Sequence, residues 1–168
     1  MTRLTRMVAS VATLVAVTAA PALAAPVFTT HLSGKDAVPA RETSATGQAT
    51  LKISTDQMAL EYKVIASNIE NVVAVRLHLG PAGSAGPEVA VLYGPVAAGA
   101  GRTNGVLTTG TLTASNLVGP MAGQSISDLI AQIRTGQVYV NVSTDDGQGA
   151  PDERSGDYSS GEIRGQLR

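Results

Sequence analysis

The two histidines are the side chains of this 168-residue sequence best suited to bind a transition metal. They are His31 and His78, and the chain has no cysteine. A tight zinc or copper site normally takes three or four protein ligands, of which neutral imidazole is a common one. Arg76 lies two residues before His78, so on a strand it shares a face with the imidazole and adds a permanent positive charge. We therefore expect His78 to be a structural residue that hydrogen-bonds a loop, with a metal ligand as the alternative.

An acidic segment at residues 145–160 is the second place where chemistry is conceivable. Its five carboxylates are Asp145, Asp146, Asp152, Glu153 and Asp157, interspersed with glycine and serine. Ca²⁺ takes six to eight oxygen ligands, which such a loop can supply. The spacing does not match the EF-hand or the calcium-binding repeats, and polar loops of this kind are usually solvated. We expect a solvated loop, keep His78, Asp145, Asp146, Asp152 and Asp157 as weak metal candidates, and expect no cofactor.

Catalytic signatures are missing from the sequence. It has no cysteine nucleophile, no Gly-x-Ser-x-Gly elbow, no phosphate-binding glycine-rich loop, and too few histidines for a copper and zinc superoxide dismutase centre. Acidic residues are present, but carboxylates in loops and at strand ends usually form weak surface ion pairs. We predict no catalytic residues and a protein that is not an enzyme.

The first 24 residues have the organisation of a secretory signal peptide. Arg3 and Arg6 form a basic start, Met7–Val17 is an apolar run, and Ala22-Leu23-Ala24 is the small-x-small pattern that signal peptidase accepts. The apolar run is too short and too polar for an anchor, which needs about 20 apolar residues. We expect cleavage after Ala24, no membrane span in residues 25–168, and a secreted or periplasmic protein.

Composition limits the partners of the mature chain. Cleavage removes two of the 12 Lys and Arg residues, and the ten that remain against 13 Asp and Glu give a net charge of −3. A weakly acidic chain with five aromatic residues and no tryptophan offers neither a basic stripe nor stacking platforms. We expect no nucleic-acid partner. The 144 residues left suffice for a single domain without a disulfide.

Apolar residues alternate with polar ones along most of the mature chain. In Gln48–Ile53, for example, every second residue is apolar, which is typical of a half-buried antiparallel strand. Turn residues separate eight such segments, so the pattern predicts an all-β sandwich or barrel. The predicted strands are residues 27–32, 48–53, 60–64, 72–79, 88–93, 105–113, 137–143 and 162–167.

One segment follows helical periodicity. The apolar residues Ile126, Leu129, Ile130 and Ile133 share one helical face within residues 125–134. Ser125 is a suitable N-cap with Asp128 three residues later, and Gly136 favours a left-handed end. We predict one short helix near 125–135 that covers an end of the sheets.

Two sequence blocks carry a family resemblance. They are the Val75–Gly83 block, with His78 at its centre, and the Gln137–Thr144 block, the latter followed by Gly161–Leu167. Together with the opening segment Phe28–Pro39 they resemble the CHRD (chordin-type) domain over nearly the whole mature chain. The resemblance implies one domain over 25–168 with an antiparallel β-sandwich, an immunoglobulin-like or superoxide-dismutase-like Greek key, of about eight strands. It implies no general biochemical activity.

The sequence departs from the family pattern at three places. Arg76 and Ser143 stand where the family usually has histidine, and the segment from Asp145 to Ser160 is longer than usual. The resemblance thus implies a histidine-based site of which this chain retains only His78. A metal-handling or redox-related extracytoplasmic protein with a degenerate histidine site is therefore the alternative function.

The polar residues that the family motifs share are candidates for a binding site. They are Asp36, His78, Asn141, Glu162 and Arg164. We hypothesise that they gather at one end of the sandwich as a ligand pocket, although Glu162 and Arg164 are most simply read as charge pairs with neighbouring strands. We predict a secreted, non-catalytic binding or structural module whose partner is an extracytoplasmic protein or a surface ligand.

Overall fold

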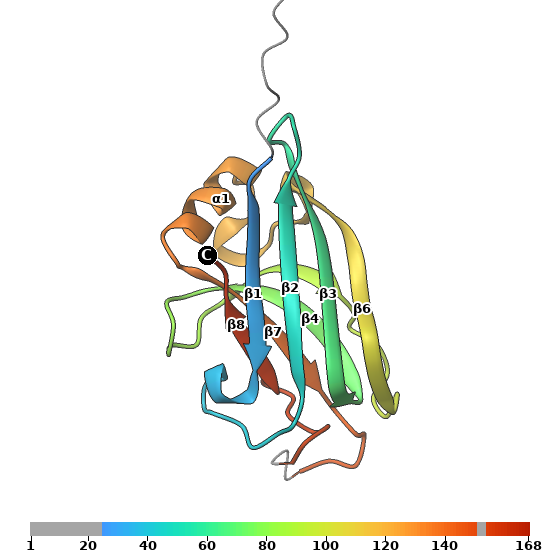
Figure 1. The fold of residues 1–168 in the computed structure, drawn as a ribbon. Helices are drawn as coiled ribbons and strands as arrows, with labels where there is room; N and C mark the ends of the chain where they lie inside the picture. Colours follow the sequence, from blue (N-terminus) through green and yellow to red (C-terminus); the bar gives the residue numbers. More distant parts are fainter. Residues whose placement is uncertain (1–24, 151–153) are drawn as a thin grey trace, which may run out of the picture.

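The fold was analysed in a computed structural model, which describes residues 25–150 and 154–168. In these residues eight strands form one sheet in the order β5-β4-β7-β8-β1-β2-β3-β6, and every neighbouring pair is antiparallel (Figure 1). The strands are β1 (Val27–Ser33), β2 (Thr46–Ile53), β3 (Ala59–Glu70), β4 (Val72–Leu79), β5 (Glu88–Tyr93), β6 (Arg102–Thr113), β7 (Val138–Thr144) and β8 (Ile163–Gln166). The predicted set of about eight antiparallel strands is confirmed.

Alternation of side chains explains the strands. In β2 the buried residues Ala49, Leu51 and Ile53 point to one face, whereas Lys52 is exposed on the other. β2 and β3 form the predicted hairpin, with Ile53 opposite Leu60, and Gln57 in the turn has a positive φ of 58°. One face of each strand therefore enters a common apolar core.

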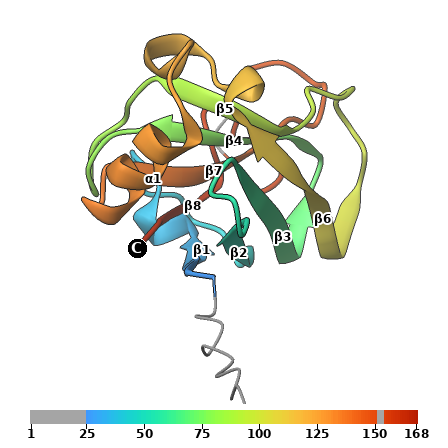
Figure 2. The ribbon, with the colours of Figure 1, turned by 90° about the horizontal axis from the view of Figure 1, so that it is seen from above.

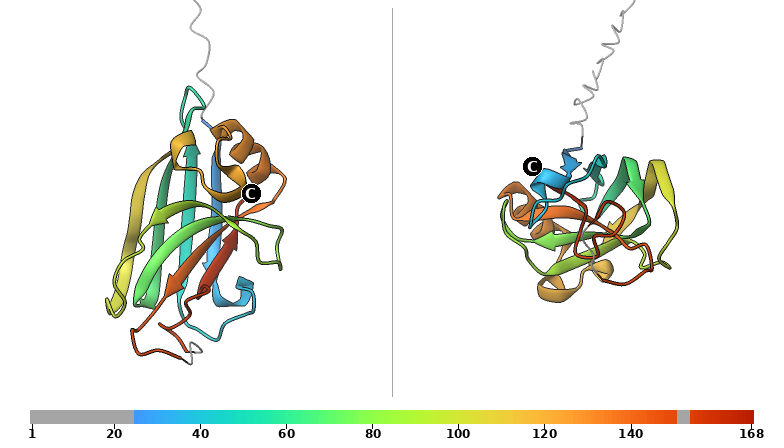
Figure 3. Two further views of the ribbon diagram at one scale, coloured as in Figure 1. Left: turned by 180° about the vertical axis from the view of Figure 1, so that it is seen from behind. Right: turned by 90° about the horizontal axis from the view of Figure 1, so that it is seen from below.

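The sheet curls until its two halves face each other across that core. β5, β4, β7 and β8 form one half and β1, β2, β3 and β6 the other, so the sheet is a nearly closed barrel (Figures 2 and 3). The halves are joined where Ser33 of β1 pairs with Arg164 of β8. At the opposite seam the hydroxyls of Tyr62 and Thr108 donate to the Leu92 carbonyl, at 2.9 and 3.1 Å.

The α-helix α1 (Ile126–Arg134) confirms the predicted helix. The Ser125 hydroxyl accepts from the Asp128 amide, and the Asp128 carboxylate in turn accepts from the Ser125 amide. Ile130 and the other three apolar residues of its face are buried, and Gly136 beyond its end has a φ of +69°. α1 lies over the end of the barrel at which β1 begins (Figure 1). Three short 3-10 helices complete the fold: η1 (Gly34–Asp36), η2 (Ala114–Asn116) and η3 (Gly119–Met121).

β3 and β6 extend further than their sequence patterns predict. The alternation breaks at Asn68, which has a φ of +55°, and the register between the two strands shifts there. The strands continue because the Asn68 amide donates to the Asn104 side chain and Ile69 packs in the core. Within 25–150 and 154–168 no helix is long and apolar enough to cross a membrane.

Candidate functional site

Polar motif residues lie in two rows on the outer face of β4, β7 and β8. In the first row Arg76 pairs with Asn141, which pairs with Arg164. In the second row His78 pairs with Tyr139, which pairs with Gln166. Cross-strand partners share a face of the sheet, and the residues between them, such as Leu77 and Val140, belong to the core. These side chains therefore point away from the core, yet all seven residues of β7 are buried because loops cover this face.

Tyr139 on the middle strand stacks with side chains from both neighbouring strands. Its ring lies 5.1 Å from the His78 ring, centroid to centroid, at an interplanar angle of 12°. The Arg164 guanidinium carbon lies 3.4 Å from the Tyr139 centroid, which is a cation-π contact. The three side chains form one stacked unit, which we call the His78-Tyr139-Arg164 stack.

This stack holds the loop between β4 and β5, residues 80–87. Arg164 donates to the carbonyl oxygens of Ser84 and Pro81 at 2.8 and 2.9 Å. His78 Nδ1 lies 2.9 Å from the Gly86 carbonyl, so Nδ1 carries the proton and donates. The expectation that His78 hydrogen-bonds a loop is confirmed.

The environment of His78 does not assemble a transition-metal site from the family's histidine positions. Arg76 is ion-paired with Glu88 at 2.8 Å. Ser143 lies on β7 four residues beyond Tyr139, which is opposite His78, so about 13 Å of strand separates positions 78 and 143. His31 is on β1, and β7 and β8 lie between β1 and β4. The two histidines of the chain therefore do not converge.

Burial is the largest influence on the pKa of His78. It lowers the pKa of the imidazole below its usual value, and the positive charges of Arg76 and Arg164 lower it further. The bond to Gly86 and the charge of Glu88 oppose this shift without cancelling it. Nε2 is buried and has no hydrogen-bond partner in the described part of the chain. Protonating Nε2 would create a positive charge and a second N–H donor there without an acceptor, so the neutral imidazole is favoured.

Glu162 is a fully buried carboxylate whose hydrogen bonds all come from neutral donors. Its Oε1 accepts from the hydroxyls of Thr43 and Ser155, and its Oε2 accepts from the Thr144 hydroxyl and the Gly156 amide, both at 2.9 Å. No ion pair involves Glu162 or Arg164 among the residues that the structure describes. The expected charge pairing of these two residues is wrong, because loop hydroxyls, amides and carbonyls satisfy them instead.

Asn141 binds the same loop as Glu162, the one that precedes β8. Its Nδ2 donates to the Ser160 carbonyl at 3.0 Å. The next residue, Gly161, has a φ of +127°, and a Cβ there would lie 2.1 Å from the Asn141 side chain. Asn141 and Glu162 therefore fasten the residues after the acidic segment, away from the stack that holds loop 80–87.

Three carboxylates of the acidic segment come together. One oxygen each from Asp145, Asp146 and Asp157 lies within 4.8 Å of the others, and Asp157 is buried. Arg154 is ion-paired with Asp146, and its Nε lies 4.0 Å from Asp157, so a cation already occupies the edge of the cluster. Asp152 lies outside the described residues.

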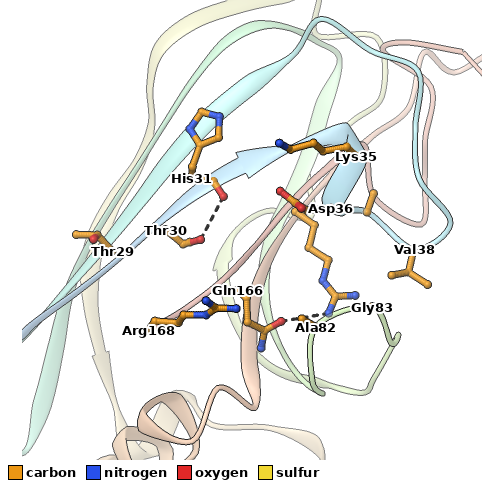
Figure 4. Close-up of a pocket in the computed structure, with 12 residues that line it drawn as sticks. Thr29, Thr30, His31, Lys35, Asp36, Val38, Ala82, Gly83, Gln166 and Arg168 are labelled. Atoms are coloured by element: carbon orange, nitrogen blue, oxygen red, sulfur yellow. Dashed lines mark hydrogen bonds between the residues drawn. The ribbon is translucent and has the colours of Figure 1, made fainter.

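Two of the five candidate binding residues, Asp36 and Arg164, line a common groove. It has a volume of about 490 Å³ and lies between β1, η1, loop 80–87 and β8 (Figure 4). We call it the Arg164 groove; its lining comprises Thr29–His31, Lys35–Val38, Ala82–Gly83, Arg164, Gln166 and Arg168. His78 stacks on Tyr139 and does not line the groove, and Asn141 and Glu162 bind the loop that precedes β8. The five candidate residues therefore do not gather in one pocket.

The sequence interpretation overlooked Lys35, Tyr139, Gln166 and Arg168. Lys35, Gln166 and Arg168 line the groove, and Tyr139 packs beneath Arg164. A signal for two of them is present, because residues 164, 166 and 168 follow the two-residue period of a strand and share its face. Lys35 carries no such signal, since only the turn of η1 brings it beside β8.

Comparison with protein-family models gives one match, to the CHRD domain, over residues 28–150. This is well over half of the chain. The chain belongs to the CHRD domain family. Comparisons with curated proteins and with solved structures gave no significant match.

The CHRD match spans β1 to β7 and ends before β8. It therefore includes His78, Tyr139 and loop 80–87, whereas Glu162, Arg164 and Gln166 lie beyond the matched residues. The side chains that fasten both loops of this CHRD domain thus come partly from residues beyond the matched segment.

Proposed function

We propose that this CHRD domain is an exported, non-catalytic binding module that presents the Arg164 groove to an extracytoplasmic ligand. The observation that carries the proposal is the groove itself. Its volume lies within the range of small-molecule and subsite pockets, about 300–1,000 Å³. Its walls are fixed, because Arg164 and Gln166, which line the groove, donate to the Ser84, Pro81 and Gly80 carbonyls of loop 80–87 and so hold that loop in place. A preformed polar hollow of this kind binds without the entropic cost of ordering a loop.

The chemistry of the motif residues supports a role in binding over one in catalysis. General acid-base catalysis needs a titratable group within hydrogen-bond reach of the substrate. His78 donates to a backbone carbonyl and is packed against Tyr139, and Glu162 is enclosed by four loop donors. Both groups stabilise loops and neither lines the groove.

The N-terminal sequence supports export, although residues 1–24 lie outside the described part of the structure. The basic start, apolar run and Ala22-Leu23-Ala24 pattern predict that the exported protein begins at Ala25. Cell fractionation followed by intact-mass measurement tests this. A protein that retains Met1 outside the cytoplasm contradicts the proposed processing.

A cysteine-free chain allows a direct test of the groove. Ala82→Cys places one thiol at the exposed rim of the Arg164 groove, and Met58→Cys places one on the exposed turn between β2 and β3 as the matched control. Each variant is exported, labelled with a photo-reactive crosslinker in its native compartment, and analysed by mass. We expect a defined adduct at position 82 and none at position 58. Equal labelling of both positions, or none at either, contradicts a ligand in the groove.

The metal-handling alternative has less support. Position 76 carries an ion-paired arginine, and positions 78 and 143 are too far apart for one ion. We expect no submicromolar binding of Cu²⁺ or Zn²⁺ by calorimetry at neutral pH. Tight binding that His78→Ala abolishes supports the alternative.

A further inference from the structure

Arg164 is a buried cation that forms no ion pair among the described residues, although the Asp36 carboxylate is near enough to attract it. The residue is 3% exposed, and its guanidinium donates to the Ser84 and Pro81 carbonyls and to Gln166 Oε1, all of them neutral groups. A guanidinium has five N–H donors, so three bonds leave two donors without a protein acceptor among the described residues. Buried charges in proteins are normally paired, because an uncompensated charge is costly to remove from water. Burial accordingly lowers the pKa of Arg164.

The groove around Arg164 has an excess of positive charge. Lys35 and Arg168 add two positive side chains, and Asp36 is the one acidic side chain in the lining. The Asp36 carboxylate accepts from the Ser33 hydroxyl at 2.6 Å, and no ion pair joins it to a cation in the described ranges. The lining side chains therefore carry a net charge of +2, whereas the mature chain as a whole carries −3. A positive hollow on an acidic domain concentrates anions locally.

A second hollow continues the positive surface. It has a volume of about 520 Å³, shares Ala82, Gln166 and Arg168 with the Arg164 groove, and adds Arg134 at the end of α1. The side chains of Lys35, Gln166 and Arg168 project around the groove opening (Figure 4). The two hollows together place four cations on one continuous surface, which is long enough for a ligand with more than one negative group.

We propose that the Arg164 groove binds a ligand that carries carboxylate, sulfate or phosphate groups, with Arg164 as the buried anchor and Lys35 and Arg168 at the rim. Arginine binds planar and tetrahedral oxyanions through charge-assisted N–H bonds, and the Nε–H and the second Nη1–H of Arg164 are the donors left to form them. The proposal rests on the proposed binding function and specifies the chemistry of its ligand.

The test uses the purified exported protein, labelled with ¹⁵N, at low ionic strength. Sodium citrate probes carboxylates, sodium sulfate probes tetrahedral oxyanions, and glucose serves as the neutral control. We expect saturable amide shifts at Ala37, Ala82 and Gly83 with citrate or sulfate and none with glucose. Shifts with citrate alone assign the site to carboxylates, and shifts with sulfate alone assign it to sulfate or phosphate groups.

Charge variants at exposed positions separate a site from general attraction. Lys35→Gln with Arg168→Gln should weaken binding about tenfold, since each removed charge acts at close range in a solvated site. Asp36→Asn should strengthen binding. Lys63→Gln with Arg102→Gln, which removes two charges from exposed positions on β3 and β6, should leave it unchanged.

Loss of affinity in the control variant Lys63→Gln with Arg102→Gln equal to that in the groove variants overturns the proposal, and so does the absence of shifts with both anions. If the anions do not bind while Ala82→Cys still forms its adduct, the ligand class is wrong but the binding function stands. If both experiments are negative, the groove is not a binding site.

Discussion

The Glu162 network allows the stabilising role of a buried carboxylate to be tested with two substitutions. Four donors converge on Glu162, and two of them, the Thr144 hydroxyl and the Gly156 amide, are themselves buried. Glu162→Met preserves the volume but leaves both buried donors without their acceptor. An unpaired buried donor costs about 1–3 kcal/mol, so the free energy of unfolding should fall by about 2–6 kcal/mol. Thr43 and Ser155 add little because they reach water.

Glu162→Gln should cost much less. The glutamine oxygen can accept from Thr144 and Gly156, and its NH₂ group can donate to the Thr43 and Ser155 hydroxyls after these rotate. Only the extra strength of charge-assisted bonds is lost, which amounts to about 1–2 kcal/mol. The exposed Glu61→Gln, which breaks the 3.5 Å pair with Lys52, is the matched control and should cost under about 0.5 kcal/mol.

Urea denaturation of the three variants measures these differences, and hydrogen exchange reports on the loop directly. The Gly156 amide should exchange faster in Glu162→Met and retain most of its protection in Glu162→Gln. Equal costs for the methionine and glutamine variants, or a cost under about 1 kcal/mol for methionine, would refute the assignment of Glu162 as the acceptor that fastens this loop.

Three further predictions concern the helix, His78 and the acidic segment. Ile130→Ala should lower the free energy of unfolding by about 2–5 kcal/mol because Ile130 is 4% exposed, whereas Gln132→Ala should cost well under 1 kcal/mol; similar denaturant midpoints would contradict the facing of α1. His78 has a lowered pKa, so the unfolded chain binds its proton more tightly, and stability should be complete above about pH 6.5 and fall as the pH drops below that value. His78→Gln should flatten this slope between pH 7.5 and 5, and an unchanged slope in His78→Gln would count against the linkage. Millimolar Ca²⁺ should leave the melting temperature unchanged because Arg154 already pairs with Asp146 at the edge of the Asp145, Asp146 and Asp157 cluster, and a rise that Asp157→Asn abolishes would show a calcium site.

Local periodicity was sufficient to predict most of the fold. The alternation in Gln48–Ile53 and the spacing of Ile126, Leu129, Ile130 and Ile133 depend on neighbours a few residues apart, and both segments adopt the expected structure. The arrangement of eight strands in a single curled sheet depends on pairings such as Ser33 with Arg164, which alternation does not encode. The alternation and the family resemblance both indicated antiparallel strands, and the sheet order came from the structure.

The candidate site was less predictable because it depends on contacts between a side chain and a distant backbone. Arg164 bonds to Pro81 and Ser84 carbonyls some 80 residues earlier in the chain, and a carbonyl leaves no trace in the amino-acid sequence. Reading Glu162 and Arg164 by charge alone therefore assigned them the wrong partners. The prediction that His78 hydrogen-bonds a loop was confirmed. It rested on the small number of histidines in the chain, which can be read directly from the sequence.

The position of β8 has a consequence for the order in which the chain can complete its fold. β8 follows every other strand in the sequence, yet it lies in the middle of the sheet, between β7 and β1. Until residues 163–166 arrive, β1 and β7 both present unpaired backbone edges, and the two halves of the barrel lack their shared strand. Pairing Ser33 with Arg164 closes a loop of most of the chain, which is a slow, long-range step. A polypeptide that emerges from a ribosome or a translocation pore with its amino terminus first therefore completes its sheet only after residues 163–166 have emerged.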